Sequence, residues 1–82
     1  MEFEFDIEKD KTNVAKHGIS LSRAVELEIL RYVPAARGGE RRVRAFGLIE
    51  GKYYCLVFTF RPNAVRAISL RRAHREEVED HE

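Results

Sequence analysis

The chain has 82 residues, of which 44% are hydrophobic and 35% charged, and a chain this short buries only one core. We therefore expect one compact domain over residues 1–82, and two domains are excluded. The net charge of +1 hides an uneven distribution, because residues 1–30 carry −3, residues 31–75 carry +9 and residues 76–82 carry −5. Ten of the eleven cations in the central block are arginine, which favours the recognition of phosphate or carboxylate groups.

The first thirty residues predict a short strand and two helices. Polar and apolar residues alternate over residues 2–5, which is typical of a strand. Asp6 is a suitable N-cap for a first helix, and Gly18 is a suitable end for it. Ser20 is a suitable N-cap for a second helix over residues 21–31.

The rest of the chain predicts a loop, three strands and a short helix. Proline and paired glycines indicate a loop over residues 34–39. Segments rich in β-branched and aromatic residues predict an antiparallel meander over residues 41–49, 53–60 and 64–70. Helix formers predict a C-terminal helix within residues 72–82. The predicted fold is therefore α+β, in the order β-α-α-β-β-β-α, with the helices packed on one sheet.

The first predicted helix has two different faces. At 100° per residue, the face expected to pack against the core consists of Ile7, Lys11, Val14, Ala15 and Gly18. The other face is polar and consists of Lys9, Asn13, Lys16 and His17. An imidazole exchanges a proton near neutral pH, so His17 is a candidate general base. The alternative is an ordinary solvated helix face, which is the more common role of such a pattern.

Arginines of the predicted strands form a second candidate site. They are Arg41, Arg42, Arg44, Arg66, Arg71 and Arg72. Successive strand residues point to opposite faces, so Arg41 and Arg66 need not share a face with the others. One interpretation is a phosphate-binding surface for RNA, whose cations also stabilise charge in a transition state. The alternative is a solvated sheet face whose charge opposes edge aggregation.

Other kinds of site have little support in the sequence. Three histidines are widely spaced and Cys55 is the single cysteine, so we expect no metal site and no cofactor. Cys55 lies in the most hydrophobic run and predicts a buried thiol. The aromatic residues of the same region are more typical of a core than of base stacking; they are Tyr53, Tyr54, Phe58 and Phe60. The acidic start and the lack of a long apolar stretch predict a cytoplasmic location.

Several of these residues together resemble the BrnT toxins of bacterial type II toxin–antitoxin systems. The most specific motifs are Lys16-His17-Gly18 after Asn13 and the run from Arg66 to Ala73, and weaker matches extend nearly from end to end. The resemblance implies a RelE-like fold and a ribonuclease that cleaves RNA to arrest translation. It also implies a partner, a BrnA-like antitoxin that has a ribbon-helix-helix domain. Two copies of the toxin and two of the antitoxin would form a complex, in which only the antitoxin contacts operator DNA. Three positions depart from the usual family pattern: Phe5 for tryptophan, Leu70 for a small residue and His81 for tyrosine.

Residue roles follow from this resemblance together with the chemistry above. The expected catalytic set, with His17 or Glu40 as the base and no metal ion, is His17, Lys16, Glu40, Arg41, Arg66 and Arg71. The expected RNA-binding residues are Lys9, Asn13, Arg42, Arg44, Ser69, Arg72 and His81. The alternative function is a non-catalytic module that binds nucleic acid or an antitoxin and cuts nothing.

Overall fold

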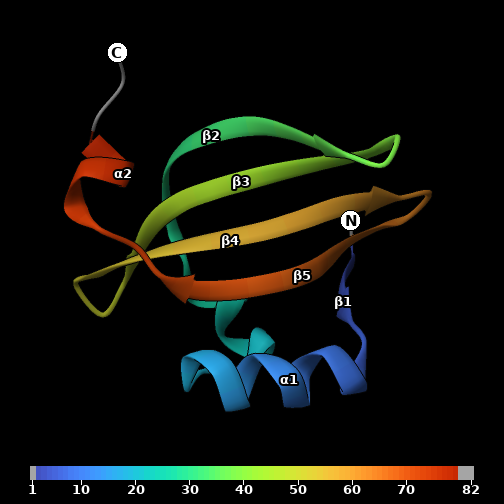
Figure 1. Ribbon diagram of the computed structural model, residues 1–82, viewed down its shortest axis with the longest axis horizontal. Helices are drawn as coiled ribbons and strands as arrows, with labels where there is room; N and C mark the ends of the chain where they lie inside the picture. The colour runs from blue at the N-terminus through green and yellow to red at the C-terminus, as the bar shows by residue number, and fades with distance from the viewer. Residues whose placement is uncertain (1, 80–82) are drawn as a thin grey trace.

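The computed structural model describes residues 2–79, apart from the side chains of residues 36 and 37. In chain order the elements are β1 (Glu2–Phe5), α1 (Ile7–His17), the 3₁₀ helix η1 (Leu21–Glu26), β2 (Glu28–Arg37), β3 (Glu40–Ile49), β4 (Lys52–Arg61), β5 (Ala64–Arg72) and α2 (Arg75–Glu79). The strands form a five-stranded sheet in the order β1-β5-β4-β3-β2 (Figure 1). β1 runs parallel to β5, and the other neighbours are antiparallel.

The predicted ends of the first helix are confirmed. The carboxylate of Asp6 accepts a hydrogen bond from the N–H of Glu8 at 2.8 Å, which satisfies one of the free donors of the first turn. Gly18 adopts φ 73°, a conformation that glycine reaches without strain, and its N–H donates to the carbonyl of Val14 at 2.9 Å. Ser20 caps η1 through a hydrogen bond from the N–H of Ser22.

The second predicted helix is wrong beyond residue 26. η1 has six residues and ends at Glu26, and after Leu27 ten residues form β2, where the sequence predicted the end of a helix and a loop. β2 pairs with β3, and a Cβ at Gly47 would collide with the backbone carbonyl of Glu28, so glycine is needed where the two strands meet. The predicted loop is reduced to a tight turn at Gly38 and Gly39, which both have positive φ. Pairing with a distant strand therefore overrides the local helical pattern.

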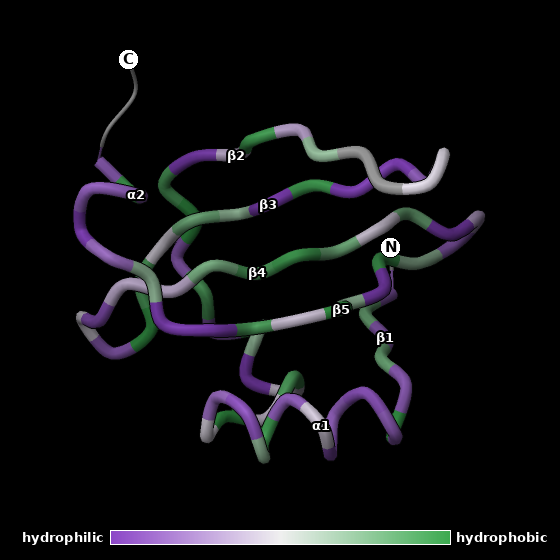
Figure 2. Tube along the Cα trace, in the orientation of Figure 1, coloured by the Kyte–Doolittle hydropathy of each residue, from purple (hydrophilic) through white to green (hydrophobic). Residues whose placement is uncertain are grey.

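Two clusters of buried side chains lie on opposite faces of the sheet. On one face α1 and η1 pack against β5, around Leu21, Leu56 and Leu70. On the other face α2 covers one end of the sheet, where Val78 joins the cluster that contains Cys55. Cys55 is fully buried, as predicted. β4 contributes to both clusters, and Figure 2 accordingly shows a continuous hydrophobic stretch along its middle.

α1 packs through its polar side, contrary to the prediction. Ile7 and Val14 of the expected packing face are 64% and 45% exposed, whereas Asn13 is 4% exposed. The carboxylate of Asp10 accepts a hydrogen bond from the N–H of Leu21 at 2.6 Å. Directional hydrogen bonds thus set the rotation of this helix about its axis, and hydrophobic periodicity alone does not report them.

Candidate functional site

A small pocket lies between α1 and the open edge of β5. β1 pairs only with residues 64–67 of β5, so the rest of that strand has no neighbour on this side. The last two turns of α1 lie against this edge and enclose a pocket of 260 Å³. Its lining consists of Lys9, Thr12, Asn13, Lys16, His17, Ile68 and Ser69. Five of the residues expected to have functional roles are therefore brought together, from two segments about 50 positions apart.

Asn13 has a structural role in this pocket, which corrects its expected role in RNA binding. Its amide nitrogen donates to the carbonyls of Ile19 and Leu70, at 2.9 and 2.8 Å. Its amide oxygen accepts from the N–H of Leu70 at 3.0 Å. The side chain thus fastens the end of α1 to β5. Lys16 and His17, which follow it by three and four positions, are exposed at the mouth of the pocket.

An extra residue in β5 places Arg66 and Arg71 on the same face of the sheet. The two lie five positions apart and would point to opposite faces of a regular strand. The pairing with β4 skips Ile68, and such a bulge reverses the alternation beyond it. Both arginines therefore lie on the face opposite α1, together with Arg42 and Arg44 of β3. We call these four residues the arginine face.

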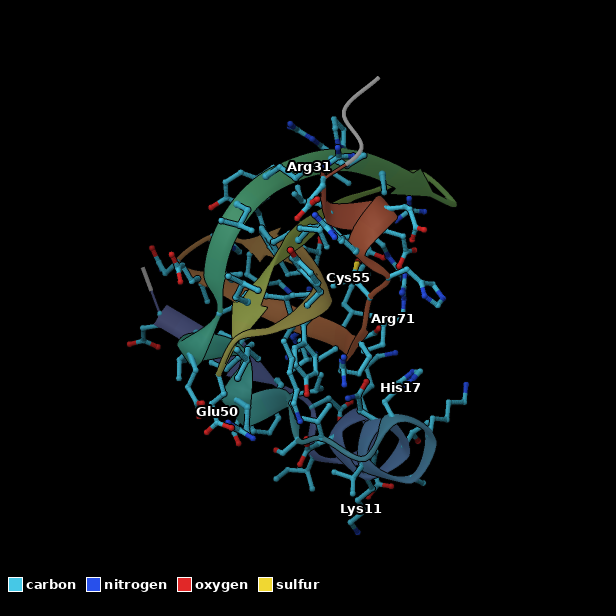
Figure 3. All side chains as sticks on the ribbon, turned by 90° about the vertical axis from the view of Figure 1, so that its left-hand side faces the viewer. Lys11, His17, Arg31, Glu50, Cys55 and Arg71 are labelled. Carbon is cyan, nitrogen blue, oxygen red and sulfur yellow. The ribbon has the colours of Figure 1, made fainter. Side chains whose placement is uncertain are left out.

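Glu77 of α2 holds Arg71 at one end of the arginine face. Its carboxylate accepts hydrogen bonds from the guanidinium at 3.2 and 3.1 Å and from the N–H of His74 at 2.9 Å. These bonds, that of Arg71 first, lower the pKa of Glu77 below its ordinary value of 4.5, and the same pair raises the pKa of Arg71. Figure 3 shows Arg71 on the side of the molecule that also carries His17.

The free energy of unfolding should fall on acidification in part through Glu77. Because its pKa is lower in the folded chain, this carboxylate stabilises the fold above about pH 4.5, and that contribution is lost as pH falls through the folded pKa. Urea titrations between pH 7 and pH 3 should show a steeper loss for the unmodified protein than for Glu77→Gln. Parallel curves for the two proteins would contradict this expectation.

The opposite end of the arginine face holds two further ion pairs. Glu4 binds Arg66 at 2.8 Å, and Glu40 binds Arg42 at 2.9 Å. Glu40 begins β3 beside the β2–β3 turn, at the other end of the sheet from the last turn of α1 (Figure 1). Arg66 and Arg71 pair with Thr59 and Cys55, four positions apart on β4, so a strand rise of about 3.3 Å per residue separates them by roughly 13 Å. The expected catalytic set is therefore split, and Glu40 does not share a site with His17.

Arg41 and Arg72 lie apart from the arginine face. Arg41 lines a groove on the sheet face that carries α1, so it does not share a face with Arg66 and Arg71, and its catalytic role stays a prediction. The guanidinium of Arg72 lies 5.5 Å from the centre of the Tyr54 ring, also on the α1 side. The expected RNA-binding residue at position 81 lies outside the described residues.

Four residues near the candidate sites were given no role from the sequence. Thr12 and Ile68 line the pocket, while Glu4 and Glu77 bind arginines of the arginine face. The sequence did contain a signal for Glu4. The alternation in β1 places its side chain on the sheet face opposite to that of its two apolar neighbours. The buried thiol of Cys55 offers no nucleophile there, since burial raises its pKa.

Residues 2–79 contain neither a cluster of metal ligands nor a helix that could span a membrane. No group of three or more His, Cys, Asp and Glu side chains in this range is arranged to hold a metal ion. No helix in the same range has the length and apolar character needed to cross a bilayer.

Comparison with known proteins agrees with the fold and with the motifs around the pocket. The family described as "Ribonuclease toxin, BrnT, of type II toxin-antitoxin system" matches residues 5–77. The chain belongs to the BrnT family. It is thus a ribonuclease toxin of a type II toxin–antitoxin system, and the resemblance inferred from its motifs is confirmed.

A solved BrnT structure shares the architecture. The 1.1 Å crystal structure of the Brucella abortus ribonuclease toxin BrnT matches with a TM-score of 0.71 and 27% sequence identity, covering 92% of this chain and 99% of that chain. The predicted α+β class, with a meander sheet and flanking helices, is confirmed by this match. A search of curated protein sequences found no match.

Proposed function

We propose that this BrnT-family protein cleaves RNA in the bacterial cytoplasm at the pocket between α1 and β5, without a metal ion, and so arrests translation. One observation supports this site most strongly. The pocket joins an imidazole, His17, to the ammonium groups of Lys9 and Lys16 and to the hydroxyl of Ser69. A general base and adjacent fixed cations are what phosphodiester cleavage requires.

The proposed reaction is an attack of the ribose 2′-hydroxyl on the adjacent phosphorus. His17 accepts the proton of the 2′-hydroxyl as the bond between the 2′-oxygen and phosphorus forms. The bond between phosphorus and the 5′-oxygen breaks, and that oxygen leaves with a proton taken from an ammonium group of the pocket or from water. Lys16 and Lys9 stabilise the negative charge that develops on the phosphorane. The products end in a 2′,3′-cyclic phosphate and a 5′-hydroxyl.

The arginine face is proposed to guide the RNA toward this pocket. Arg44 lies in its middle, is exposed, and forms no ion pair with a carboxylate of the described residues. Arg42, Arg66 and Arg71 are held by glutamates, so a phosphate that binds them has to displace a carboxylate. We therefore assign phosphate binding first to Arg44, while Arg66 and Arg71 flank the pocket residues Ile68 and Ser69 along β5.

The partner that we propose is a cognate antitoxin with a ribbon-helix-helix DNA-binding domain. It holds the toxin inactive in a complex with two copies of each chain, and operator DNA is contacted through the antitoxin alone. Membership in a type II toxin–antitoxin family supports this assignment. The basic block of the sheet also suits an acidic polypeptide.

RNA cleavage in the presence of a chelator tests the proposed reaction. The purified protein should cut single-stranded RNA in excess EDTA at an unchanged rate, and the fragments should carry 2′,3′-cyclic phosphate ends. Added Mg²⁺ should not raise the rate. Cleavage that stops in EDTA and returns with Mg²⁺ would show that a metal ion takes part. Salt-sensitive binding of RNA that stays intact would instead support the non-catalytic binding module.

A further inference from the structure

An apolar groove lies on the α1 side of the sheet, in a part that α1 leaves uncovered. α1 and η1 contact β5, and beside them β2, β3 and β4, together with Val65 of β5, line a groove of 580 Å³. Tyr32, Phe58 and Phe60 provide its aromatic surface, with ring centres 6.4 and 5.5 Å apart in edge-to-face arrangements. Phe58 is buried, but Tyr32 and Phe60 are 59% and 51% exposed.

These exposed rings are unusual for a small protein that needs its apolar area in the core. Ile29, at 40% exposure, extends the same surface toward the start of β2. Continuous apolar surface rimmed by polar groups is typical of an interaction site, whereas single exposed apolar residues are common everywhere. The prediction that Phe60 belongs to the core is therefore wrong, and its exposure marks the groove.

A cation without an acidic partner lies at the rim of the groove. Arg41 lines the groove and two hollows that adjoin it. The neighbouring carboxylate, Glu40, is bound to Arg42 on the other face, and Arg41 forms no ion pair within the described residues. An occupant that combines apolar side chains with a carboxylate would satisfy both the aromatic surface and Arg41.

We propose that this groove binds an amphipathic helix of the antitoxin, which inserts apolar side chains between Tyr32 and Phe60 and presents a carboxylate to Arg41. The inference rests on the proposed function only in taking the antitoxin as the partner. An added strand is a poor alternative, because Pro34 lacks an N–H and the pairing of β2 is irregular between Ile29 and Arg31.

A second copy of this chain fits the groove less well than an antitoxin helix does. In a two-fold symmetric dimer each surface meets its own copy, so the Arg41 side chains of both protomers would enter one apolar interface. Burial of two guanidinium groups with no carboxylate between them is unfavourable, because the charges lose their hydration and repel each other. An acidic, amphipathic partner avoids this repulsion.

The groove lies on the other face of the sheet from the arginine face, so antitoxin binding and RNA cleavage should be separable by mutation. Isothermal titration with the purified cognate antitoxin should show affinity lowered about tenfold or more by Phe60→Ser, Tyr32→Ser or Arg41→Glu. Val25→Ser, which removes a still more exposed apolar side chain from η1, should leave the affinity within about twofold. RNA cleavage by the folded Phe60→Ser and Tyr32→Ser variants should match that of the unmodified protein.

Unchanged affinity in the groove variants would overturn the proposal, as would an antitoxin that fails to bind the unmodified protein. If the variants instead changed only the sedimentation of the free toxin, the occupant would be a second copy and the antitoxin assignment would be wrong. Antitoxin binding is measured without RNA and does not depend on cleavage. A protein that binds the antitoxin but cuts no RNA would therefore contradict the proposed ribonuclease site without affecting the proposal for the groove. Two aromatic variants, Phe60→Ser and Tyr32→Ser, are compared so that the test remains decisive if one of them does not fold.

Discussion

Replacement of His17 by alanine is expected to lower the rate of RNA cleavage by about 10²–10⁴. The imidazole shares the pocket with Lys9, Lys16 and Ser69, and it is the proposed general base there. Its loss leaves the cations that stabilise the phosphorane but removes the base. The measurement is the single-turnover rate on a defined RNA under conditions that saturate the enzyme.

Two controls separate this effect from a general loss of charge or of structure. His74→Ala removes an exposed histidine outside the pocket and should leave the rate unchanged. Lys11→Ala removes a cation from α1 whose side chain points away from the side of His17 (Figure 3), and it should also have no effect. Equal rates for the unmodified protein and a folded His17→Ala variant would assign the base to another residue. A fall in both His74→Ala and His17→Ala would indicate a nonspecific cause.

Replacement of Asn13 by alanine is expected to lower the free energy of unfolding by about 3 kcal/mol or more. The change leaves two carbonyls and one N–H without their partner, and each unsatisfied buried group costs about 1–3 kcal/mol. A small domain is stable by about 5–15 kcal/mol, so the loss is a large part of the total. At about 4–8 °C per kcal/mol, the melting temperature should fall by more than about 12 °C.

Thr12→Ala is the matched control for this stability measurement. Thr12 neighbours Asn13 in α1 but is exposed, and its hydroxyl makes one long hydrogen bond, 3.3 Å, to the carbonyl of Glu8. Its replacement should change the free energy of unfolding by about 0.5 kcal/mol or less. Urea titrations of both variants measure the difference. A loss below about 1 kcal/mol in Asn13→Ala would mean that water replaces the amide and that α1 is held mainly by other contacts.

These two predictions concern the same helix face. Asn13 fastens α1 to β5 and thereby turns the following residues, Lys16 and His17, toward the open edge of that strand. Asn13→Ala should therefore also reduce RNA cleavage, because His17 is displaced and not because a contact with RNA is lost. We therefore expect Asn13 to act as a positioning residue, in contrast to the substrate contact expected from its place on a polar face.

Much of the local structure and the family could be read from the sequence. Asp6 and Gly18 bound the first helix because caps depend on short-range hydrogen bonds and on glycine's tolerance of positive φ. The three strands after residue 40 follow from runs of β-branched and aromatic residues. Lys16-His17 and the run from Arg66 to Ala73 carry enough of the family pattern to indicate a BrnT ribonuclease toxin.

Only the tertiary structure decided which residues share a site. Residues 28–37 become a strand because β3 offers a partner, and the bulge at Ile68 puts Arg66 and Arg71 on one face. α1 turns its polar side inward because Asn13 binds Leu70, 57 positions away, and hydropathy does not describe directional bonds between distant residues. The net charge of +1 and the basic block are properties of the chain. Their division into an arginine face, the proposed catalytic pocket and a separate Arg41 at an apolar groove depends on long-range strand register, which the local sequence does not encode.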